Sequence, residues 1–332
     1  MSDDPVIEPF RREHLEDAAG LFTESIRQER LQSPLLPERF EDPATILPRL
    51  KNLSERSPGV AAICQKQLRG FMMGWPLPSW RGRRSVCVPE WAHAEIGGDR
   101  VKILNAMYEN LARQWIGDGC FTHLVGVLAH DRDIIDALFW LGFGLGAVDA
   151  MRDLGEVRGP FADVEIRRAG VEDTDVILSL CHGQERYMAA SPTFMALVEL
   201  TGEEDCRNLL TDPGVATWLA SYEGEAVSRL RIGPSHEGAA YVISDEKTAS
   251  ITAAFTREHV RGLGIAASLL KHSLAWASSA GYERCAVDFE PENVLGRSFW
   301  LRHFEPVCYA LVRHVDVRIA WANETRKDEH FR

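Results

Sequence analysis

The stretch Phe255-Thr-Arg-Glu-His-Val-Arg-Gly-Leu-Gly-Ile-Ala266 decides how the rest of the chain is interpreted. Residues 250–255 before it favour a β-strand, and apolar residues at helical spacing follow it, namely Ala266, Leu269, Leu270, Leu274 and Ala277. A strand is therefore predicted to lead into a helix through a turn that contains Gly262 and Gly264. Glycine lets backbone N–H groups approach a ligand, and a helix N-terminus attracts negative charge. With Arg261 beside them, these residues predict a site for an anion such as a pyrophosphate.

Two other interpretations fit the same residues. An ordinary βα turn uses glycine only to turn sharply. The pattern Gly262-x-Gly264-x-x-Ala267 also fits a dinucleotide-binding unit of an oxidoreductase, with Asp288 and Glu290 near the expected ribose-binding acid. Two features count against this second interpretation: six residues separate the strand from the first glycine, and the pattern lies close to the end of the chain.

Length and composition set the broad class of the protein. The chain has 332 residues, of which 45% are hydrophobic, so it can bury a large core and two domains are expected. A net charge of -12 argues against nucleic acid as a partner. The seven cysteines form no C-x-x-C pair and the histidines lack ligand spacing, so we expect reduced thiols and no metal. With neither a signal peptide nor a long apolar run, a cytoplasmic protein without a membrane partner is expected.

The sequence also contains an internal repeat. Phe139-Trp-Leu141 recurs 160 residues later as Phe299-Trp-Leu301. At the same spacing, the helix-like segment 103–115 matches 263–275, and the strand-like segment 123–128 matches 283–288. We therefore predict two copies of one unit. The predicted divisions are a first domain at 1–155, a second at 164–318 and a polar tail at 319–332.

Each copy is predicted to have the same order of strands and helices. In the first copy the pattern favours a strand at 5–10, helices at 12–31 and 43–55, strands at 59–65 and 68–75, a loop at 75–84, a helix at 99–116, a strand at 121–128 and a helix at 131–141. In the second it favours a strand at 164–168, helices within 171–210, strands at 215–222 and 225–233, a strand that ends at Phe255, a helix at 263–280, a strand at 285–290, a helix at 293–302 and strands within 304–317.

This order of elements, together with Arg261-x-x-Gly264-x-Ala266, resembles the GNAT family of N-acetyltransferases. A second family signature is similar to Asn293-Val-Leu-Gly-Arg-Ser-Phe-Trp300, which His303-Phe304 follows where the family commonly has Gly-Phe. The resemblance implies an α/β fold with a mixed sheet, arranged as two tandem GNAT-like acyl-CoA N-acyltransferase domains.

The resemblance further implies direct transfer of an acetyl group from acetyl-CoA to a primary amine of a small molecule or of a peptide. Acetyl-CoA would lie between the strands 251–255 and 285–290, with its pyrophosphate on the glycine turn. The cofactor-binding residues would be Phe255, Thr256, Val260, Arg261, Gly262, Leu263, Gly264, Ile265, Ala266, Asn293 and Ser298. The acidic composition favours a cationic acceptor, such as an amino sugar or a polyamine.

The catalytic residues are predicted with less support from the resemblance. Asp288 and Glu290 share one face of a strand by alternation, so either carboxylate is a candidate for the base that deprotonates the amine. Trp300 stands where the family often has a tyrosine that protonates the leaving thiolate, and an indole is no acid near neutral pH. Tyr309 is a candidate substitute. A CoA-binding sensor or scaffold without turnover is therefore the alternative function.

The first copy has lost the residues of the anion site. Residues 101–106, Val-Lys-Ile-Leu-Asn-Ala, correspond to 261–266 and contain neither glycine nor arginine. Asp133 stands at the position of Asn293 and adds negative charge. We therefore expect the first copy not to bind CoA. The oligomeric state is left open.

Overall fold

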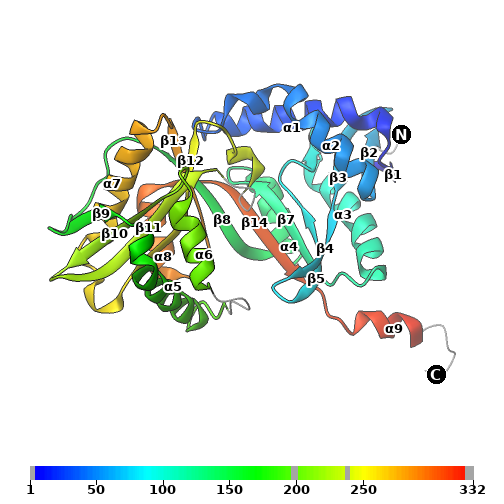
Figure 1. The fold of residues 1–332 in the computed structure, drawn as a ribbon. Coiled ribbons are helices and arrows are strands. Elements are labelled where there is room, and N and C mark those ends of the chain that lie inside the picture. Colours follow the sequence, from blue (N-terminus) through cyan, green and yellow to red (C-terminus); the bar gives the residue numbers. More distant parts are fainter. Residues whose placement is uncertain (1–3, 196–200, 236–239, 326–332) are drawn as a thin grey trace. The chain divides into compact units, whose positions relative to one another are not determined.

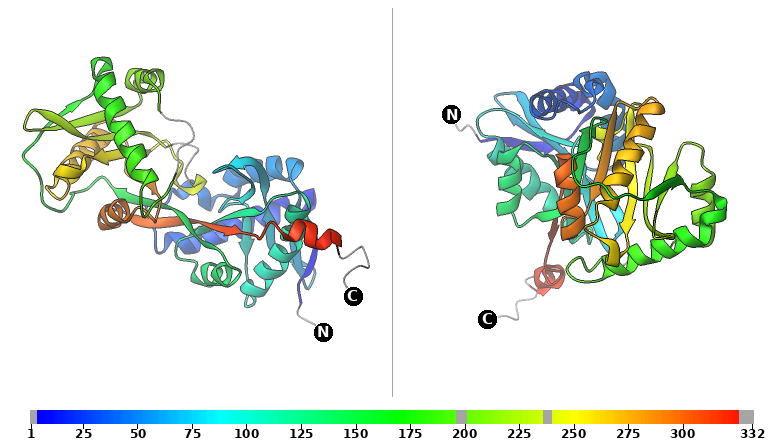
Figure 2. Two further views of the ribbon diagram at one scale, coloured as in Figure 1. Left: turned by 90° about the horizontal axis from the view of Figure 1, so that it is seen from below. Right: turned by 90° about the vertical axis from the view of Figure 1, so that its left-hand side faces the viewer.

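A computed structural model describes residues 4–195, 201–235 and 240–325 (Figures 1 and 2). Its contacts divide the chain into two compact units. The first unit comprises 1–146, 240–242 and 307–332, and the second comprises 147–239 and 243–306. Each unit thus includes a segment from the other predicted copy. The ranges 1–155 and 164–318 remain a prediction about the sequence repeat.

The first unit contains two sheets and five helices among its described residues. One sheet has the order β1-β2-β3-β6, and the other contains β4, β5, β7 and β14 in this order. The strands are β1 (Val6–Pro9), β2 (Gly59–Cys64), β3 (Gln67–Met73), β4 (Trp75–Trp80), β5 (Arg83–Val88), β6 (His93–Glu95), β7 (Thr122–Leu128) and β14 (Glu305–His314). The helices are α1 (Leu15–Arg30), α2 (Pro43–Arg56), α3 (Arg100–Gly117), α4 (Arg132–Trp140) and α9 (Ile319–Thr325). The apolar stripe predicted on α3 is buried, as its Leu104, Met107 and Leu111 show.

The second unit is built on one mixed sheet with the order β8-β13-β12-β11-β10-β9. Its strands are β8 (Gly144–Asp153), β9 (Glu165–Arg168), β10 (Ala216–Tyr222), β11 (Glu225–Pro234), β12 (Thr248–Thr256) and β13 (Arg284–Phe289). Only β12 and β13 pair in parallel within this described sheet. Its helices are α5 (Thr174–Ala189), α6 (Glu203–Thr211), α7 (Ile265–Ser279) and α8 (Val294–His303).

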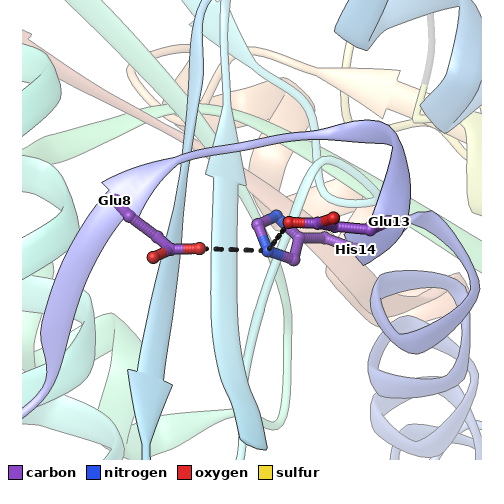
Figure 3. A group of neighbouring side chains, drawn as sticks. All are labelled: Glu8, Glu13 and His14. Atoms are coloured by element: carbon purple, nitrogen blue, oxygen red, sulfur yellow. Dashed lines mark ion pairs between the residues drawn. The ribbon is translucent and has the colours of Figure 1, made fainter. Parts of the chain in front are cut away.

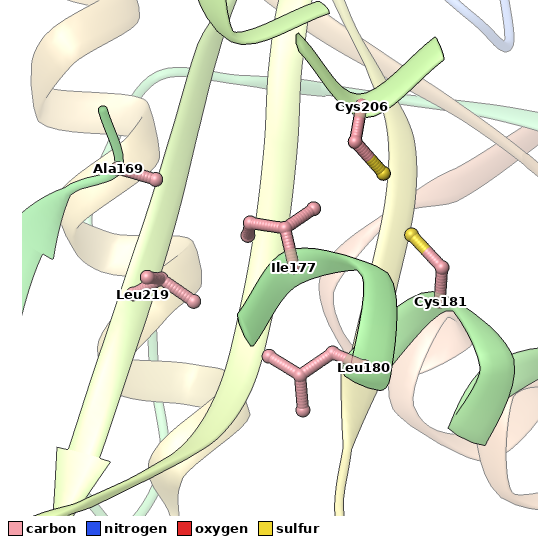
Figure 4. Close-up of a cluster of buried hydrophobic side chains, with 6 residues drawn as sticks. All are labelled: Ala169, Ile177, Leu180, Cys181, Cys206 and Leu219. Atoms are coloured by element: carbon pink, nitrogen blue, oxygen red, sulfur yellow. The ribbon is translucent and has the colours of Figure 1, made fainter. Parts of the chain in front are cut away.

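The two faces of this sheet are covered by different helices. Figure 4 shows one core cluster, in which α5 and α6 pack on β10 through Ala169, Ile177, Leu180, Cys181, Cys206 and Leu219. The neighbouring residue Trp218 points the other way and meets His272 of α7, with ring centroids 4.3 Å apart. Because successive strand side chains alternate between faces, α7 covers the face opposite to α5 and α6.

Three segments differ from the prediction. Residues 75–84, expected as a loop, form the hairpin of β4 and β5. The two prolines that indicated a loop lie in β4, which is the first strand in the order of its sheet and therefore an edge strand, where proline is tolerated. The strand β8 was not predicted. The polar tail begins with the helix α9, while residues 326–332 lie outside the described residues.

None of the helices within the described ranges combines the length and the apolar character needed to cross a bilayer.

Candidate active site

The parallel strands β12 and β13 separate before they end. They pair from Thr248 opposite Arg284 to Ile251 opposite Val287, although β12 continues to Thr256. Residues 248–251 are buried, whereas residues 252–256 are partly exposed. A strand edge that opens in this way offers backbone N–H and C=O groups to a ligand. The opening lies between the two strands that the sequence predicted to hold the cofactor.

A cavity of about 390 Å³ adjoins the opened end of β12. Its walls come from α5, β11, β12, the turn before α7, the first turn of α7, and α8. Most of the predicted cofactor-binding residues line it: Phe255, Thr256, Val260, Arg261, Gly262, Gly264, Ile265, Ala266, Asn293 and Ser298. Leu263 is 46% exposed and does not line it. The fold thus brings together residues more than 40 positions apart in the sequence.

The turn before α7 requires glycine at one position in particular. Gly262 and Gly264 both have left-handed backbones, with φ angles of 83° and 88°. At Gly264 a Cβ atom would also lie 2.5 Å from the carbonyl oxygen of Pro160, whereas nothing lies within 4 Å of a Cβ atom at Gly262. The segment that contains Pro160 is held against α7, because the Ala162 N–H donates to Ser268 Oγ at 3.1 Å. The close approach of these two segments therefore depends on Gly264.

The turn presents a positive surface to the cavity. Among the described residues, no acceptor is found for the backbone N–H groups of Gly262, Leu263 and Gly264. They precede the N-terminus of α7, where the helix dipole is positive. Arg261 Nε donates to the Thr256 carbonyl at 3.1 Å, and its guanidinium lies 4.3 Å from the centre of the Tyr187 ring. These groups together form a site suited to a phosphate or a pyrophosphate.

Asn293 begins helix α8 and connects it to α5. Its Oδ1 accepts the Gly296 N–H at 3.0 Å as a helix N-cap and the Tyr187 hydroxyl at 3.1 Å. The Asn293 side chain therefore fixes two walls of the cavity. The sequence predicts that Asn293 caps α8. It does not predict the hydrogen bond that Asn293 accepts from Tyr187 on α5.

The predicted catalytic residues lie outside the cavity. Asp288 is exposed on β13 opposite Asp149, and Glu290 follows the end of β13. Tyr309 belongs to the first unit, where it lies opposite Val127 of β7, and burial raises the pKa of its hydroxyl. Trp300 does line the cavity and is only 8% exposed. The catalytic roles of Asp288, Glu290 and Tyr309 remain predictions.

Sequence reasoning missed several residues that line the cavity. From α5 come Gln184, Tyr187 and Met188, and from β11 comes Arg229. The helix residues have no recognisable spacing signal. Arg229 did have one, since it interrupts the apolar pattern of a central strand. His303 was noted only as a departure from the family, yet it lines the cavity, and burial lowers the pKa of its imidazole.

A cluster of possible metal ligands, Glu8, Glu13 and His14, lies in the first unit (Figure 3). The backbone N–H of Arg11 donates to His14 Nδ1 at 3.0 Å, so Nε2 carries the proton of the neutral ring. This Nε2 lies 3.2 Å from Glu8 Oε1. The Glu8–His14 contact is therefore a hydrogen bond near the start of α1, whereas Glu13 Oε1 lies 4.0 Å from the same Nε2.

The first unit has an acidic cavity near the start of α3. It measures about 380 Å³, and its acidic lining residues are Glu24, Glu29, Glu95, Asp131 and Asp133. Arg100, which also lines it, donates to the Glu95 carbonyl at 2.9 Å and pairs with Asp131. A polyanion is repelled by such a lining. This agrees with the expectation that the first copy does not bind CoA.

A mixed sheet that opens between two parallel strands, followed by a glycine turn at the start of the next helix, is the arrangement predicted for an acyltransferase fold. Residues 184–304 match the model of the acetyltransferase (GNAT) family, and this part of the chain is a GNAT N-acetyltransferase domain. GNAT proteins generally use acetyl-CoA to acetylate amines. The predicted family and the mixed α/β fold are thereby confirmed.

Two of the solved structures that resemble this chain align with most of its length. A GCN5-related N-acetyltransferase from Sphaerobacter thermophilus is 12% identical, with a TM-score of 0.58 over 95% of this chain and 96% of that one. A glucosamine N-acetyltransferase region of a fungal multi-domain β-N-acetylglucosaminidase is 14% identical, with a TM-score of 0.53 over 94% of this chain and 38% of that one. At these identities the likeness concerns the fold alone. No curated protein sequence matches the chain.

Proposed function

We propose that the second unit transfers the acetyl group of acetyl-CoA directly to a primary amine. The observation that supports this most is the glycine turn with Arg261 at the mouth of an opened strand pair. Arg261, the glycine N–H groups and the start of α7 suit the pyrophosphate. The exposed edge of β12 suits the amides of the pantetheine arm.

The reaction needs only bond exchange at one carbonyl carbon. The neutral amine attacks the thioester, the C–N bond forms, the C–S bond breaks, and the amine releases one proton. A backbone N–H near Phe255 is proposed to stabilise the developing oxyanion. The thiolate can leave without an acid because its pKa is not high, which fits Trp300 in the place of the family's usual tyrosine.

The proton acceptor is proposed to be Glu290 or Asp288, acting through water. Because neither residue lines the cavity, His303 is a second candidate: its lowered pKa keeps the imidazole neutral and able to accept a proton near pH 7. The pH profile of kcat separates these candidates. If the fall of kcat at low pH disappears in Glu290→Gln or in His303→Asn, the substituted residue is the base. If the fall is unchanged in a variant, the residue substituted in that variant is not the base.

Binding of acetyl-CoA is the first test. Calorimetry should give one site per chain, since the first unit lacks the glycine turn. Arg261→Glu should weaken binding by at least about 100-fold, because it replaces a cation beside the pyrophosphate with an anion. Arg113→Glu, which reverses an exposed arginine on α3, is the matched control and should bind normally. Absence of wild-type binding at millimolar acetyl-CoA would overturn the proposal.

A binding protein without turnover is the second candidate, and the indole at Trp300 is the observation that favours it. Release of CoA thiol with a panel of amines distinguishes the two. If acetyl-CoA binds but no acceptor raises thiol release above background, the sensor or scaffold function is correct. Protection against heat by NAD but not by CoA would instead favour a nucleotide-dependent oxidoreductase.

A further inference from the structure

Arg229 is a buried cation in the wall of the cavity. Its side chain is 6% exposed on the central strand β11. Arg229 NH2 donates to Gln184 Oε1 at 2.7 Å, whereas the Nε group is buried without a hydrogen-bond partner. Among the described residues no carboxylate forms an ion pair with it. Glu185, also buried, uses its Oε1 to accept the Thr201 N–H at 3.0 Å. Burial lowers the pKa of the Arg229 guanidinium.

A buried guanidinium with an unpaired N–H group destabilises the fold unless a ligand accepts its hydrogen bonds. A buried charge without a counterion strongly destabilises a fold, and a buried donor without an acceptor adds to this. Arginine is retained in such places where its planar group binds a carboxylate or a phosphate through two parallel hydrogen bonds. The partly satisfied guanidinium of Arg229 therefore indicates an anionic ligand group.

Arg229 is a second cation in the same cavity as Arg261. Arg229 lies directly opposite Phe255 across the β11–β12 pair, so the two side chains share a face of the sheet. Phe255 packs toward α5, and the Arg229 partner Gln184 lies on α5. The glycine turn leads into α7, which covers the opposite face, but its Arg261 guanidinium lies 4.3 Å from the centre of the Tyr187 ring on α5 and 5.8 Å from that of Phe255. Arg261 is the cation proposed for the pyrophosphate, which leaves Arg229, held by Gln184, for a second anionic group.

We infer that the acceptor carries a carboxylate beside its reactive amine and that Arg229 binds this carboxylate. The inference rests on the function proposed above. It assigns the acceptor to amino acids or short peptides, rather than to the amino sugars or polyamines that the net charge of -12 favours. The cation at Arg229 carries more weight than the net charge of the chain. The acidic residues that produce the net charge are spread over both units, and salt screens them.

The test uses the full chain, acetyl-CoA and matched acceptors that differ only in the acidic group. Each amino acid is compared with its carboxamide and with its decarboxylated amine, and CoA thiol release is measured. The acid should have a kcat/KM at least about 100-fold above both analogues, because they leave the guanidinium unpaired. Equal or better turnover of the uncharged analogues would overturn the inference and leave the proposed transfer intact.

Variants at two neighbouring arginines test the role of the side chain. Arg229→Gln should abolish the preference for the acid over the carboxamide, mainly through KM for the acceptor, while KM for acetyl-CoA stays the same. Arg229→Lys keeps the charge without the planar group and serves if the glutamine variant does not fold. Arg231→Gln is the matched control, since Arg231 points to the same face but its Nε donates to Thr252 Oγ1 at 2.7 Å. A preserved preference for the acid in a folded Arg229→Gln protein would overturn the assignment.

A binding measurement separates failure of this inference from failure of the proposed function. N-acetyl amino acids carry the same carboxylate and need no turnover to bind. With CoA present they should raise Tm in the wild type but not in Arg229→Gln, whereas their carboxamides should not raise Tm in either protein. If no acceptor releases thiol and this carboxylate-dependent shift is still seen, only the proposed transfer fails. If the shift is absent, the carboxylate site is wrong.

Discussion

Gly262 and Gly264 lie two residues apart and have similar φ angles, yet their surroundings differ. A Cβ atom at Gly264 would meet the Pro160 carbonyl oxygen at 2.5 Å, and backbone atoms cannot move aside as a flexible side chain can. At Gly262 the space is open, so only the strain of a left-handed backbone applies, about 1 kcal/mol. The two glycines thus make a matched pair for testing the turn.

We predict that Gly264→Ala weakens acetyl-CoA binding by at least about tenfold more than Gly262→Ala does. The reason is that a methyl group at Gly264 pushes the turn away from residues 158–160 and displaces the N–H groups. Calorimetry on both variants measures the difference. Equal affinities would mean that the contact with Pro160 does not shape the site.

The residues of the anion site could be predicted because glycine and arginine have conformational and charge properties that do not depend on context. Arg229 and Tyr187 could not be assigned in the same way. An arginine in a strand is usually solvated, and only the packing of α5 against β11 shows that this one is buried. The catalytic predictions at Asp288 and Glu290 used strand alternation, which gives the face of a residue but not whether a cavity reaches it.

At the level of elements, a chain of buried hydrogen bonds connects α3, β7 and β14 in the first unit. Arg313 NH1 donates to the Tyr108 hydroxyl at 3.0 Å, which lies 2.8 Å from His123 Nδ1. His123 Nε2 lies 3.1 Å from the Cys120 carbonyl oxygen and donates to it. The His123 ring is therefore held neutral. Burial lowers the pKa of His123 to about 4.

This depressed pKa predicts a dependence of stability on pH. Between pH 6.5 and pH 4 the unfolded chain binds a proton at His123 that the folded chain does not. Stability is therefore full above pH 6.5 and falls as the pH drops toward 4, by about 3 kcal/mol. The free energy of unfolding in urea, measured between pH 4 and pH 7.5, checks this. His123→Gln keeps both hydrogen bonds without a titrating group and should have a smaller pH dependence; an unchanged slope would contradict the prediction.

The elements that sequence patterns predicted are those with a strong local signal. The stripe of apolar residues on α3 and the glycines before α7 were sufficient to predict these two helices. The strand β8 lacked such a signal, because Gly144 and Gly146 begin it and both favour a turn. Its residues form a strand because they pair with β13, and this long-range pairing is not encoded in nearby residues.

The whole molecule is organised by an exchange of strands. The second unit takes β8 from the end of the first predicted copy, where Asp153 to Val148 pair with Arg284 to Phe289. The first unit takes most of β14 from the end of the second copy, where Cys308 to His314 pair with β7. A cut between 155 and 164 therefore leaves each half without a strand of its sheet.

We predict that fragment 164–332 does not fold to a form that binds acetyl-CoA, because the edge of β13 is left without β8. Fragment 147–306 contains every residue of β8 that pairs with β13 and should retain binding within about tenfold of the full chain. Circular dichroism and calorimetry on the two fragments provide the comparison. Normal binding by 164–332 would mean that β8 is dispensable.

The exchange also bears on how the gene for such a chain can change. A deletion of residues 1–155 also removes β8 and leaves β13 without the strand that pairs with it. A deletion that begins at residue 307 removes most of β14, which pairs with β7. A change of the gene that shortens one unit therefore alters the sheet of the other unit as well.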